Sequence, residues 1–370
     1  MILGIAVVLA LSLELVTRVV GRMMGPSWPI TRAVAFDREI REALRLYRRH
    51  PFLNTAPREG AVVTAFGKTA TLSSAGYRSP DRPLEKPAGV VRIVCSGGST
   101  TFDILAPDNA GTWPSRLEAE LQGERPEVEV FNAGFPGWTS LENLISLAIR
   151  DVDLSPDLVV LYQGINDLQP AAHRPYDPQY EHGHAELAVR ALGFELAPPK
   201  WYERSLLVEK GRDLFYGPDN PWRMLQAPSP TGEPLPAIPA AAVATFERNV
   251  RSFVAVAEAH GASVVLATQP VRVRAHAEGQ DLEYLARWIE GLDPQAVPDQ
   301  LDRLNEVLRR LGDELNVAVL DVAGDVAWHD DDFDDPMHFS AGGSERMGRY
   351  AKTALAPLLA DSHIRPAARD

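Results

Sequence analysis

Five short, mostly apolar runs recur along the chain after residue 89. Successive positions within each run are largely apolar, so both faces of each segment are suited to burial. Strands of a parallel sheet that is covered on both faces show this pattern. We therefore predict five buried strands, at Val90–Cys95, Val128–Asn132, Leu158–Tyr162, Ser263–Ala267 and Val317–Asp321.

The stretches between these runs show helical periodicity instead. Apolar residues recur three and four positions apart, which is typical of a helix with one buried face. Strands that alternate with such helices predict an α/β sandwich around a parallel sheet. The two clearest stripes are Val243, Phe246, Val250, Phe253, Val254 and Ala257, and Leu301, Leu304, Leu308, Leu311 and Leu315.

One long segment breaks this alternation. Residues 170 to 239 hold twelve of the thirty prolines and contain no clear strand pattern. A long irregular connection inside a domain is typical of a lid, a binding loop or a mobile segment. Its aromatic side chains could stack on sugar rings or only pack the segment down, and the sequence leaves both open. These aromatics are Tyr176, Tyr180, Trp201, Tyr202, Phe215, Tyr216 and Trp222.

Composition narrows the range of partners. The chain has 370 residues, with 37 basic and 50 acidic side chains and a net charge of −13. This acidic balance argues against nucleic acid, whose binding depends on Lys and Arg, and against a polybasic membrane patch. The single cysteine, Cys95, excludes an internal disulfide and a zinc cluster built from cysteines. Its place inside the first predicted strand indicates a buried packing residue.

The N-terminus carries an apolar run from Ile2 to Leu13 that resumes after Glu14 as far as Val20. This length is close to the ~20 residues of a spanning helix, so we expect a membrane anchor or signal-anchor over residues 1–22. A cleaved signal peptide and a buried core helix are the alternatives. Basic residues follow the run and none precedes it, which by the positive-inside rule disagrees with export. The native start could therefore lie upstream.

Polar residues follow the strands at the edge where ligands bind in open parallel sheets. Ser99 lies in a glycine-rich turn after the first strand, and Gly134 follows the second. Asn166 follows the third strand, and an acidic loop after the fifth ends in Asp335 and His338. These are the parts of a serine acyl-transfer site.

The chemistry of such a site assigns each residue a role. Ser99 is the candidate nucleophile and needs an adjacent base, for which His338 is the candidate. Asp335 can hold the imidazole tautomer and stabilise the imidazolium. The backbone N–H groups of Ser99 and Gly134, with the side-chain amide of Asn166, can form an oxyanion hole.

These motifs resemble the conserved blocks of the SGNH (GDSL-type) hydrolase family in order and spacing. The matching positions are the Gly98-Ser99-Thr100 turn, Gly134, the Gly164-Ile165-Asn166-Asp167 run and the Asp335-x-x-His338 pair. The resemblance implies a flavodoxin-like three-layer α/β/α sandwich with a five-stranded parallel sheet. It also implies a Ser99–His338–Asp335 triad, with Ser99, Gly134 and Asn166 at the oxyanion hole, and hydrolysis or transfer of acyl esters.

The upstream segment also resembles the leader of membrane-anchored bacterial members of the family. Two motifs carry this likeness, Tyr47-x-x-His50-Pro51-Phe52-Leu53 and Gly76-Tyr77-Arg78. We therefore expect an anchor over 1–22, a leader over 23–88 and a hydrolase domain over 89–362 with an insertion at about 170–240.

One position departs from the family pattern. Gly98 stands where the family commonly has Asp, although that carboxylate is not the triad acid. Two other folds are disfavoured because their motifs are missing. An α/β-hydrolase needs the pattern Gly-x-Ser-x-Gly around its nucleophile. Around Ser99 the second glycine of this pattern is replaced by Thr101. A dinucleotide site needs Gly-x-Gly-x-x-Gly after the first strand, and the sequence has none there.

Each site residue also has a structural interpretation. Ser99 could be an ordinary turn serine, Gly134 a glycine with positive φ, and Asn166 and Asp167 helix caps. His338 could be a surface histidine before a helix that Ser340 caps. We favour the catalytic interpretation, because it would be a coincidence for all of these structural interpretations to hold at once.

Metal sites are also less favoured than simpler interpretations. The acidic run from Asp330 to Asp335 lacks the ligand spacing of a calcium loop, so we expect a solvated loop whose last Asp serves the site. His173, His182, His184 and Glu186 lie in the proline-rich segment without a metal motif. We expect neither metal nor cofactor.

The sequence thus predicts a membrane-tethered, extracytoplasmic serine esterase. Its expected substrate is a short acyl ester, such as an acetyl ester, on a saccharide or cell-envelope polymer. An O-acyltransferase with the same triad is the first alternative, because both enzymes share an acyl-enzyme. A non-catalytic binding protein on the same scaffold is the second. The oligomeric state does not follow from the sequence.

Overall fold

The computed structural model describes residues 12–16, 19, 39–40, 42–53, 55–179, 232–272 and 279–360. Most of the anchor expected at 1–22 and of the insertion expected at 170–240 therefore lies outside the described residues, as do His182, His184 and Glu186. Within the described ranges, no helix is both long and apolar enough to cross a membrane.

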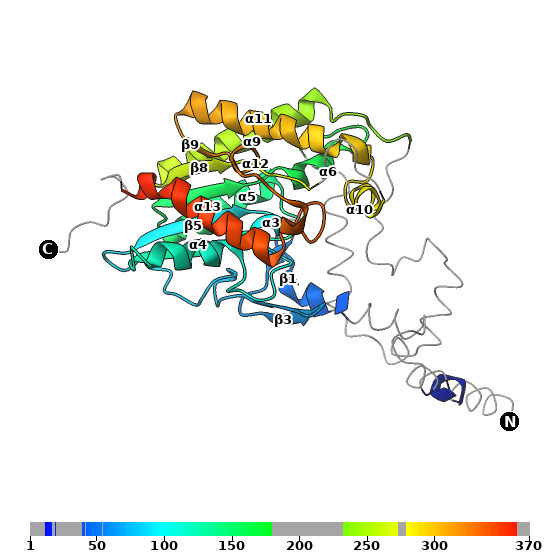
Figure 1. The fold of residues 1–370 in the computed structure, drawn as a ribbon, viewed down its shortest axis with the longest axis horizontal. Helices are drawn as coiled ribbons and strands as arrows, with labels where there is room; N and C mark the ends of the chain where they lie inside the picture. The colour runs from blue at the N-terminus through cyan, green and yellow to red at the C-terminus, as the bar shows by residue number, and fades with distance from the viewer. Residues whose placement is uncertain are drawn as a thin grey trace.

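A five-stranded parallel sheet forms the centre of the molecule (Figure 1). Its strand order is β6-β5-β7-β8-β9. The strands are β5 (Val91–Gly97), β6 (Val128–Asn132), β7 (Leu158–Tyr162), β8 (Ser263–Ala267) and β9 (Ala318–Leu320). All five predicted strands are confirmed. Strand β5 continues two residues beyond its predicted end, and β9 is shorter than predicted at both ends.

Helices cover both faces of the sheet, giving the three-layer α/β/α sandwich. One face packs against α5 (Ser140–Ile149), α9 (Ala240–Ala259) and α11 (Val297–Leu315). The other face packs against α4 (Trp113–Gln122) and α13 (Ala341–Leu359). Val94 of β5 belongs to the first core, whereas its neighbours Ile93 and Cys95 belong to the second. This alternation explains why the strands are apolar at successive positions.

Short helical elements connect the layers. Three of them, α3, η4 and α12, follow the carboxyl ends of β5, β7 and β9. The short elements are α3 (Ser99–Phe102), η3 (Asp151–Leu154), η4 (Ile165–Asp167), α6 (Leu168–Ala171), α10 (Gln280–Trp288), η7 (Pro294–Ala296), α12 (Val322–Asp325) and η8 (Asp330–Asp332).

The leader forms two small antiparallel pairs after η2 (Leu44–Leu46). Strand β1 (Tyr47–Arg48) pairs with β2 (Ala56–Pro57), and β3 (Val62–Ala65) pairs with β4 (Lys68–Thr71). Phe66 and Gly67 join β3 to β4 with φ angles of 52° and 73°, which gives the tight turn that suits a two-residue hairpin.

The leader packs onto the loops that carry the candidate site. Leu46, Leu53 and other leader side chains share one hydrophobic cluster with Phe102, Phe135 and Trp138. The indole N–H of Trp138 also donates to the backbone oxygen of Thr55 over 2.9 Å. The leader thus supports the segments that immediately follow Ser99 and Gly134.

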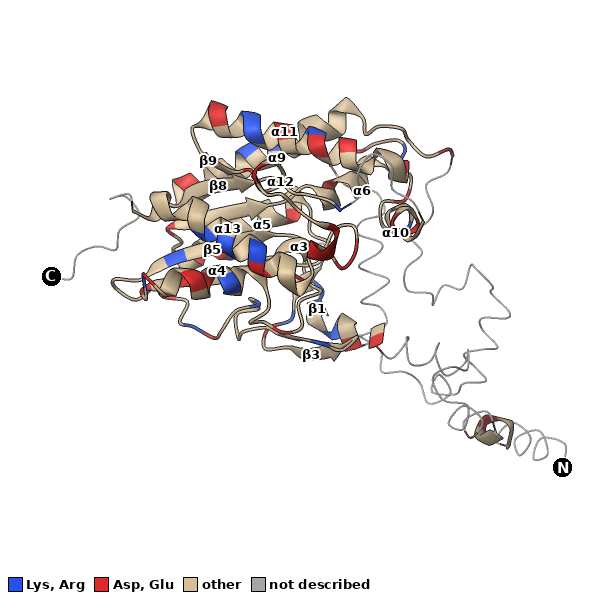
Figure 2. Ribbon diagram, viewed as in Figure 1, with Lys and Arg blue, Asp and Glu red and all other residues tan. Residues whose placement is uncertain are grey.

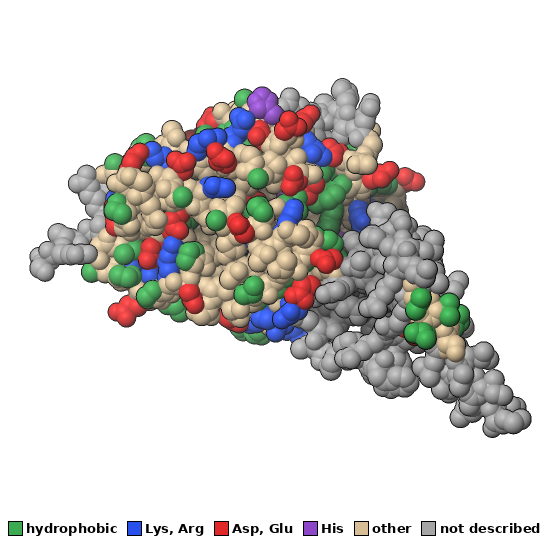
Figure 3. All heavy atoms as spheres, turned by 60° about the horizontal axis from the view of Figure 1, so that its bottom comes forward, with side chains coloured by type: hydrophobic (Ala, Val, Ile, Leu, Met, Phe, Trp, Pro, Cys, Tyr) green, Lys and Arg blue, Asp and Glu red, His purple; other side chains and the backbone are tan. Residues whose placement is uncertain are grey.

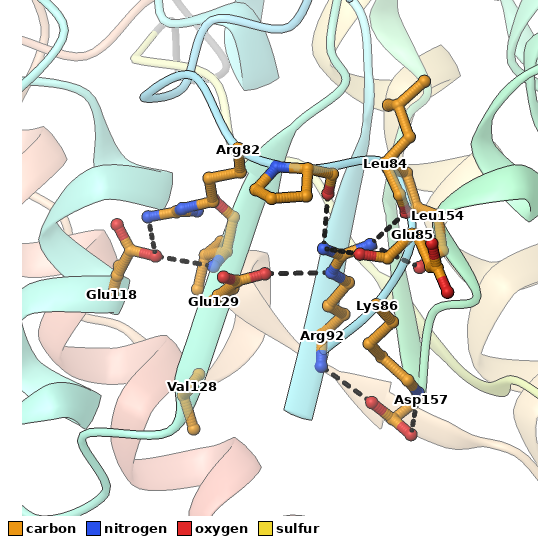
Figure 4. A network of polar contacts seen from close by, with 12 residues as sticks. Arg82, Leu84, Glu85, Lys86, Arg92, Glu118, Val128, Glu129, Leu154 and Asp157 are labelled. Carbon is orange, nitrogen blue, oxygen red and sulfur yellow. Dashed lines mark hydrogen bonds and ion pairs between the residues drawn. The ribbon is translucent and has the colours of Figure 1, made fainter. Parts of the chain in front are cut away.

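A polar network closes the opposite, amino end of the sheet (Figure 4). The fully buried Arg92 of β5 donates to the backbone oxygens of Pro83, Leu84 and Leu154 over 2.6, 2.6 and 3.0 Å. Its Nε lies 2.9 Å from Glu129 Oε2. One side chain therefore fixes the end of the leader against β5.

Replacing Arg92 with Met should lower the free energy of unfolding by about 3–5 kcal/mol, because the buried carbonyl groups lose their donor. The matched control is Arg349→Met, which removes an exposed pair with Glu345 and should cost at most about 0.5 kcal/mol. Urea titration of both variants and of the wild-type protein measures the free energy of unfolding of each. Equal stability of the two variants would contradict the role given to Arg92.

Candidate active site

Ser99 begins α3 directly beyond the carboxyl end of β5. The turn between them requires Gly97, where an added Cβ would lie 2.0 Å from Thr101 Oγ1 and 2.4 Å from the backbone oxygen of Tyr162. The chain crosses from β6 on one side of β5 to β7 on the other, so this is the point where strand order reverses. Open α/β sheets bind ligands at such points.

The structure brings Ser99, His338 and Asp335 into one hydrogen-bonded chain. Ser99 Oγ lies 2.8 Å from His338 Nε2, and His338 Nδ1 lies 2.8 Å from Asp335 Oδ2. Ser99 and His338 are 9% and 6% exposed. The surface-histidine interpretation is therefore wrong, although Ser340 does cap α13 as that interpretation assumed.

Asp335 is held by several donors. Its Oδ1 accepts the backbone N–H groups of Met337 and His338 over 2.8 and 2.9 Å. Burial alone would raise the pKa of this carboxyl, but the hydrogen bonds and the charge of His338 outweigh burial and lower it. Asp335 therefore stays ionised and fixes Nδ1 as the protonated nitrogen of the neutral imidazole.

Gly134 packs directly against the Ser99 helix. An added Cβ would lie 2.5 Å from the backbone nitrogen of Phe102 and 2.6 Å from Thr101 Cβ, so only glycine permits this approach. The Gly134 N–H donates to Asn132 Oδ1 over 3.1 Å. This donor therefore has a partner of its own in the absence of substrate.

Asn166 lies beside the residue that precedes Ser99. An added Cβ on Gly98 would lie 2.2 Å from Asn166 Nδ2, which gives a steric reason for glycine where the family commonly has Asp. Asn166 Nδ2 donates to the backbone oxygen of Trp138 over 2.8 Å. A primary amide has two N–H groups, so the second remains for another acceptor.

Sequence reasoning missed Gln269, which lies beyond the end of β8. Its Oε1 accepts the backbone N–H of Ile165 over 2.9 Å, and its Nε2 donates to Thr100 Oγ1 over 2.9 Å. This buried amide thus joins the segment that carries Asn166 to the helix that carries Ser99. A single glutamine after a strand belongs to no motif, so the sequence alone does not indicate that it bridges these two segments.

Asp167 is also buried, and its side chain does not cap α6, the helix that follows it, as its structural interpretation assumed. Its carboxylate accepts the backbone N–H of Ser140 over 3.0 Å and Gln163 Nε2 over 2.8 Å. Burial raises its pKa to about 6, while these hydrogen bonds oppose the rise. The side chain anchors the Asn166 segment to α5 instead of capping α6.

The acidic loop lies beside α3 (Figure 2). Asp330, Asp331 and Asp334 are exposed as expected, but Asp332 is only 6% exposed. Its carboxylate accepts the backbone N–H of His329 and pairs with Arg346 over 3.2 Å. The prediction of a solvated loop whose last Asp serves the site is therefore wrong at Asp332.

Metal-binding side chains do not gather in the described ranges: no three His, Cys, Asp or Glu there are grouped to hold an ion. Cys95 is fully buried within β5, as predicted, and burial raises the pKa of its thiol.

Comparison with known proteins decides the family. Residues 95–346 match the GDSL-like lipase/acylhydrolase family, and this match spans more than half of the chain. The chain belongs to this family. The matched range of this acylhydrolase contains all five site residues: Ser99, Gly134, Asn166, Asp335 and His338. No match was found among curated proteins.

Several solved structures are similar to this acylhydrolase. The lipase/acylhydrolase from Enterococcus faecalis is 19% identical, with a TM-score of 0.44 over 76% of this chain and 100% of that one. An acetyl xylan esterase, AlAXEase, is 14% identical, with a TM-score of 0.43 over 72% and 100% of the two chains. A G-D-S-L family member from Veillonella parvula DSM 2008 is 13% identical, with a TM-score of 0.41 over 72% and 99%.

Replacing Gly98 with Ala should displace the amide of Asn166 and lower kcat by between ~10-fold and the ~10²–10³ that loss of one oxyanion donor costs. The matched control is Gly342→Ala on α13, where an added Cβ meets nothing nearer than 3.7 Å. Steady-state hydrolysis of p-nitrophenyl acetate measures both. A Gly98→Ala enzyme as active as the control would show that this contact is not needed.

Proposed function

We propose that this acylhydrolase is a serine esterase that removes short acyl groups, acetyl first among them, from a saccharide or cell-envelope polymer. The observation that supports this proposal is the continuous chain from Ser99 Oγ through His338 to Asp335, with both links at 2.8 Å. A serine hydroxyl becomes a nucleophile when an oriented base lies within hydrogen-bond distance.

In the proposed reaction, Ser99 Oγ attacks the ester carbonyl carbon while His338 Nε2 takes the hydroxyl proton. The tetrahedral intermediate collapses, the C–O bond to the alcohol breaks, and His338 returns that proton to the leaving oxygen. Water then attacks the acyl-enzyme, giving its proton to His338. The second collapse releases the carboxylic acid, and Ser99 Oγ regains its proton from His338.

Three donors are proposed for the oxyanion. The backbone N–H of Ser99 is at the first position of α3, where a helix leaves its N–H groups without an intrahelical acceptor. Asn166 offers the N–H that does not bind Trp138. The N–H of Gly134 must be shared with Asn132 or released from it, so we assign Gly134 a smaller contribution than Asn166.

The charges around the site favour an uncharged substrate. Asp330, Asp331 and Asp334 are exposed in the loop that carries the proposed triad acid, and Lys68 of the leader lies 4.0 Å from Asp334. Three exposed carboxylates in this loop disfavour anionic esters and do not act against neutral acylated sugars. On the face in Figure 3, acidic and basic side chains are interspersed.

Replacing Ser99 with Ala should lower kcat for p-nitrophenyl acetate by up to ~10⁶, and Asn166→Ala should lower it by ~10²–10³. The control is Ser263→Ala, at an exposed position at the amino end of β8, which should retain full activity. Thermal melts confirm that all three variants fold. Undiminished activity of the Ser99→Ala enzyme would contradict the proposed nucleophile.

We further propose that the N-terminal segment attaches the enzyme to a membrane, with the catalytic domain outside the cytoplasm. The described part of this segment supports the proposal, because Leu15, Val16 and Val19 expose 63%, 54% and 46% of their surfaces. Large apolar side chains are suited to contact with lipid.

Deleting residues 1–22 should move the protein from the membrane fraction of expressing bacteria to the soluble fraction, because the apolar run Ile2–Leu13 is lost. In spheroplasts, added protease should digest the full-length chain, whereas a cytoplasmic marker protein should survive. Equal fractionation of the two chains would contradict the anchor. Protection of the full-length chain from protease would contradict the proposed orientation.

A further inference from the structure

Asp335 has one more donor, from an element outside the motifs of the family. Tyr284 on α10 donates its phenolic hydrogen to Asp335 Oδ2 over 2.9 Å. The same oxygen accepts from His338 Nδ1 over 2.8 Å. Two donors therefore share the single carboxylate oxygen through which Asp335 acts on the imidazole.

Burial in the hydrophobic core holds helix α10, which carries Tyr284, in place. Leu285 of α10 and Ile289, the residue that follows the helix, are buried in the core with exposures of 0% and 2%. Tyr284 is partly buried against the same core. The position of the phenol is therefore set by packing and does not depend on the hydrogen bond alone.

Arg272 ties α10 to the loop that carries Asp335. Its guanidinium pairs with Asp281 of α10 through two nitrogens. Its Nη1 donates to the backbone oxygen of Phe333 over 3.1 Å, and its backbone N–H donates to that of Pro336 over 3.0 Å. The loop and the helix thus form one unit in which Tyr284 faces Asp335.

Tyr284 acts only as a donor. Burial raises the pKa of its phenol, and the negative charge of Asp335 and the hydrogen bond to it raise the pKa further. At neutral pH the phenol therefore keeps its proton and acts as the donor of this hydrogen bond.

We infer that Tyr284 is a positioning residue that sets the basicity of His338 through Asp335. The inference rests on the proposed serine esterase function. A donated hydrogen bond withdraws negative charge from Oδ2, so the carboxylate stabilises the imidazolium less strongly. The imidazole then stays neutral, and able to accept the serine proton, down to a lower pH.

Other charged groups also act on this pair. The charge of Asp103, at the end of α3, interacts with that of His338. Arg272 interacts with Asp335, and Arg287 of α10 interacts with Tyr284. All three remain when only the phenolic oxygen of Tyr284 is removed, so that change isolates the hydrogen bond.

The test compares Tyr284→Phe with the wild-type full-length enzyme. The ring and its packing remain, while the acidic limb of kcat/KM against pH should move upward by roughly 0.4–1 pH unit, the equivalent of one hydrogen bond. Activity should therefore fall most at low pH and recover on the alkaline side of the limb. The matched control is Tyr350→Phe, which removes a 2.8 Å bond to Asp325 outside the site and should leave the limb unmoved.

A second measurement does not depend on catalysis. The ring of His338 is titrated by NMR in protein labelled with ¹⁵N-histidine, and its signals are assigned by their loss in His338→Gln. Its midpoint should rise in Tyr284→Phe, and the rise should vanish when Asp335→Asn is present in both chains. An unmoved midpoint, or an equal rise in the Asp335→Asn background, would overturn the inference. An active Ser99→Ala enzyme would instead overturn the proposed function on which it rests.

Discussion

The hydrogen bond between Ser99 Oγ and His338 Nε2 joins two residues that are 239 positions apart in the chain. Its 2.8 Å length depends on how α3, after β5, sits relative to the loop before α13. Asp103 braces these two segments directly. Asp103 ends α3 with its backbone in the left-handed region, and its carboxylate accepts a hydrogen bond from Ser344 Oγ of α13 over 2.7 Å. Burial raises the pKa of Asp103 to about 6, although the bonds from Ser344 and Trp113 oppose the rise.

The two ends of the sheet have different tasks. At the carboxyl end, Gly97 and Gly134 let backbone segments approach more closely than a side chain would allow, and Gly98 leaves room for the side-chain amide of Asn166. At the amino end, Arg92 satisfies backbone oxygens from two distant segments and holds the leader in place. The leader continues to the carboxyl end, where it packs behind Phe102 and Phe135. The leader therefore connects the amino end of the sheet, at Arg92, to the candidate site at the carboxyl end.

Much of this architecture could be predicted because it has local causes. The five strands are apolar on both faces, and the stripes of α9 and α11 repeat at helical spacing, so both show directly in the sequence. Ser99, Gly134, Asn166, Asp335 and His338 could be singled out because each follows a strand at the edge that binds ligands. The structure brings Ser99, Asp335 and His338 into contact, and it places Gly134 and Asn166 against the turn and helix that carry Ser99.

What escaped prediction depends on tertiary contacts. Gln269 and Tyr284 are ordinary polar residues in sequence, and only the fold brings them to Thr100 and Asp335. Asp332 was placed in solvent because five aspartates gather in its loop, yet distant Arg346 pairs with it. The partner of the Gly134 N–H, Asn132, is two residues away, but the bond depends on the turn between them.

The central claim is that Ser99 is a nucleophile activated by His338. The most direct measurement is mass-spectrometric peptide mapping after treatment with a fluorophosphonate, which phosphonylates activated serines. We predict one adduct per chain, on Ser99, formed rapidly in the wild-type protein and greatly slowed in His338→Gln. An adduct at another serine, or ester hydrolysis that persists in a protein whose Ser99 stays unmodified, would contradict the account.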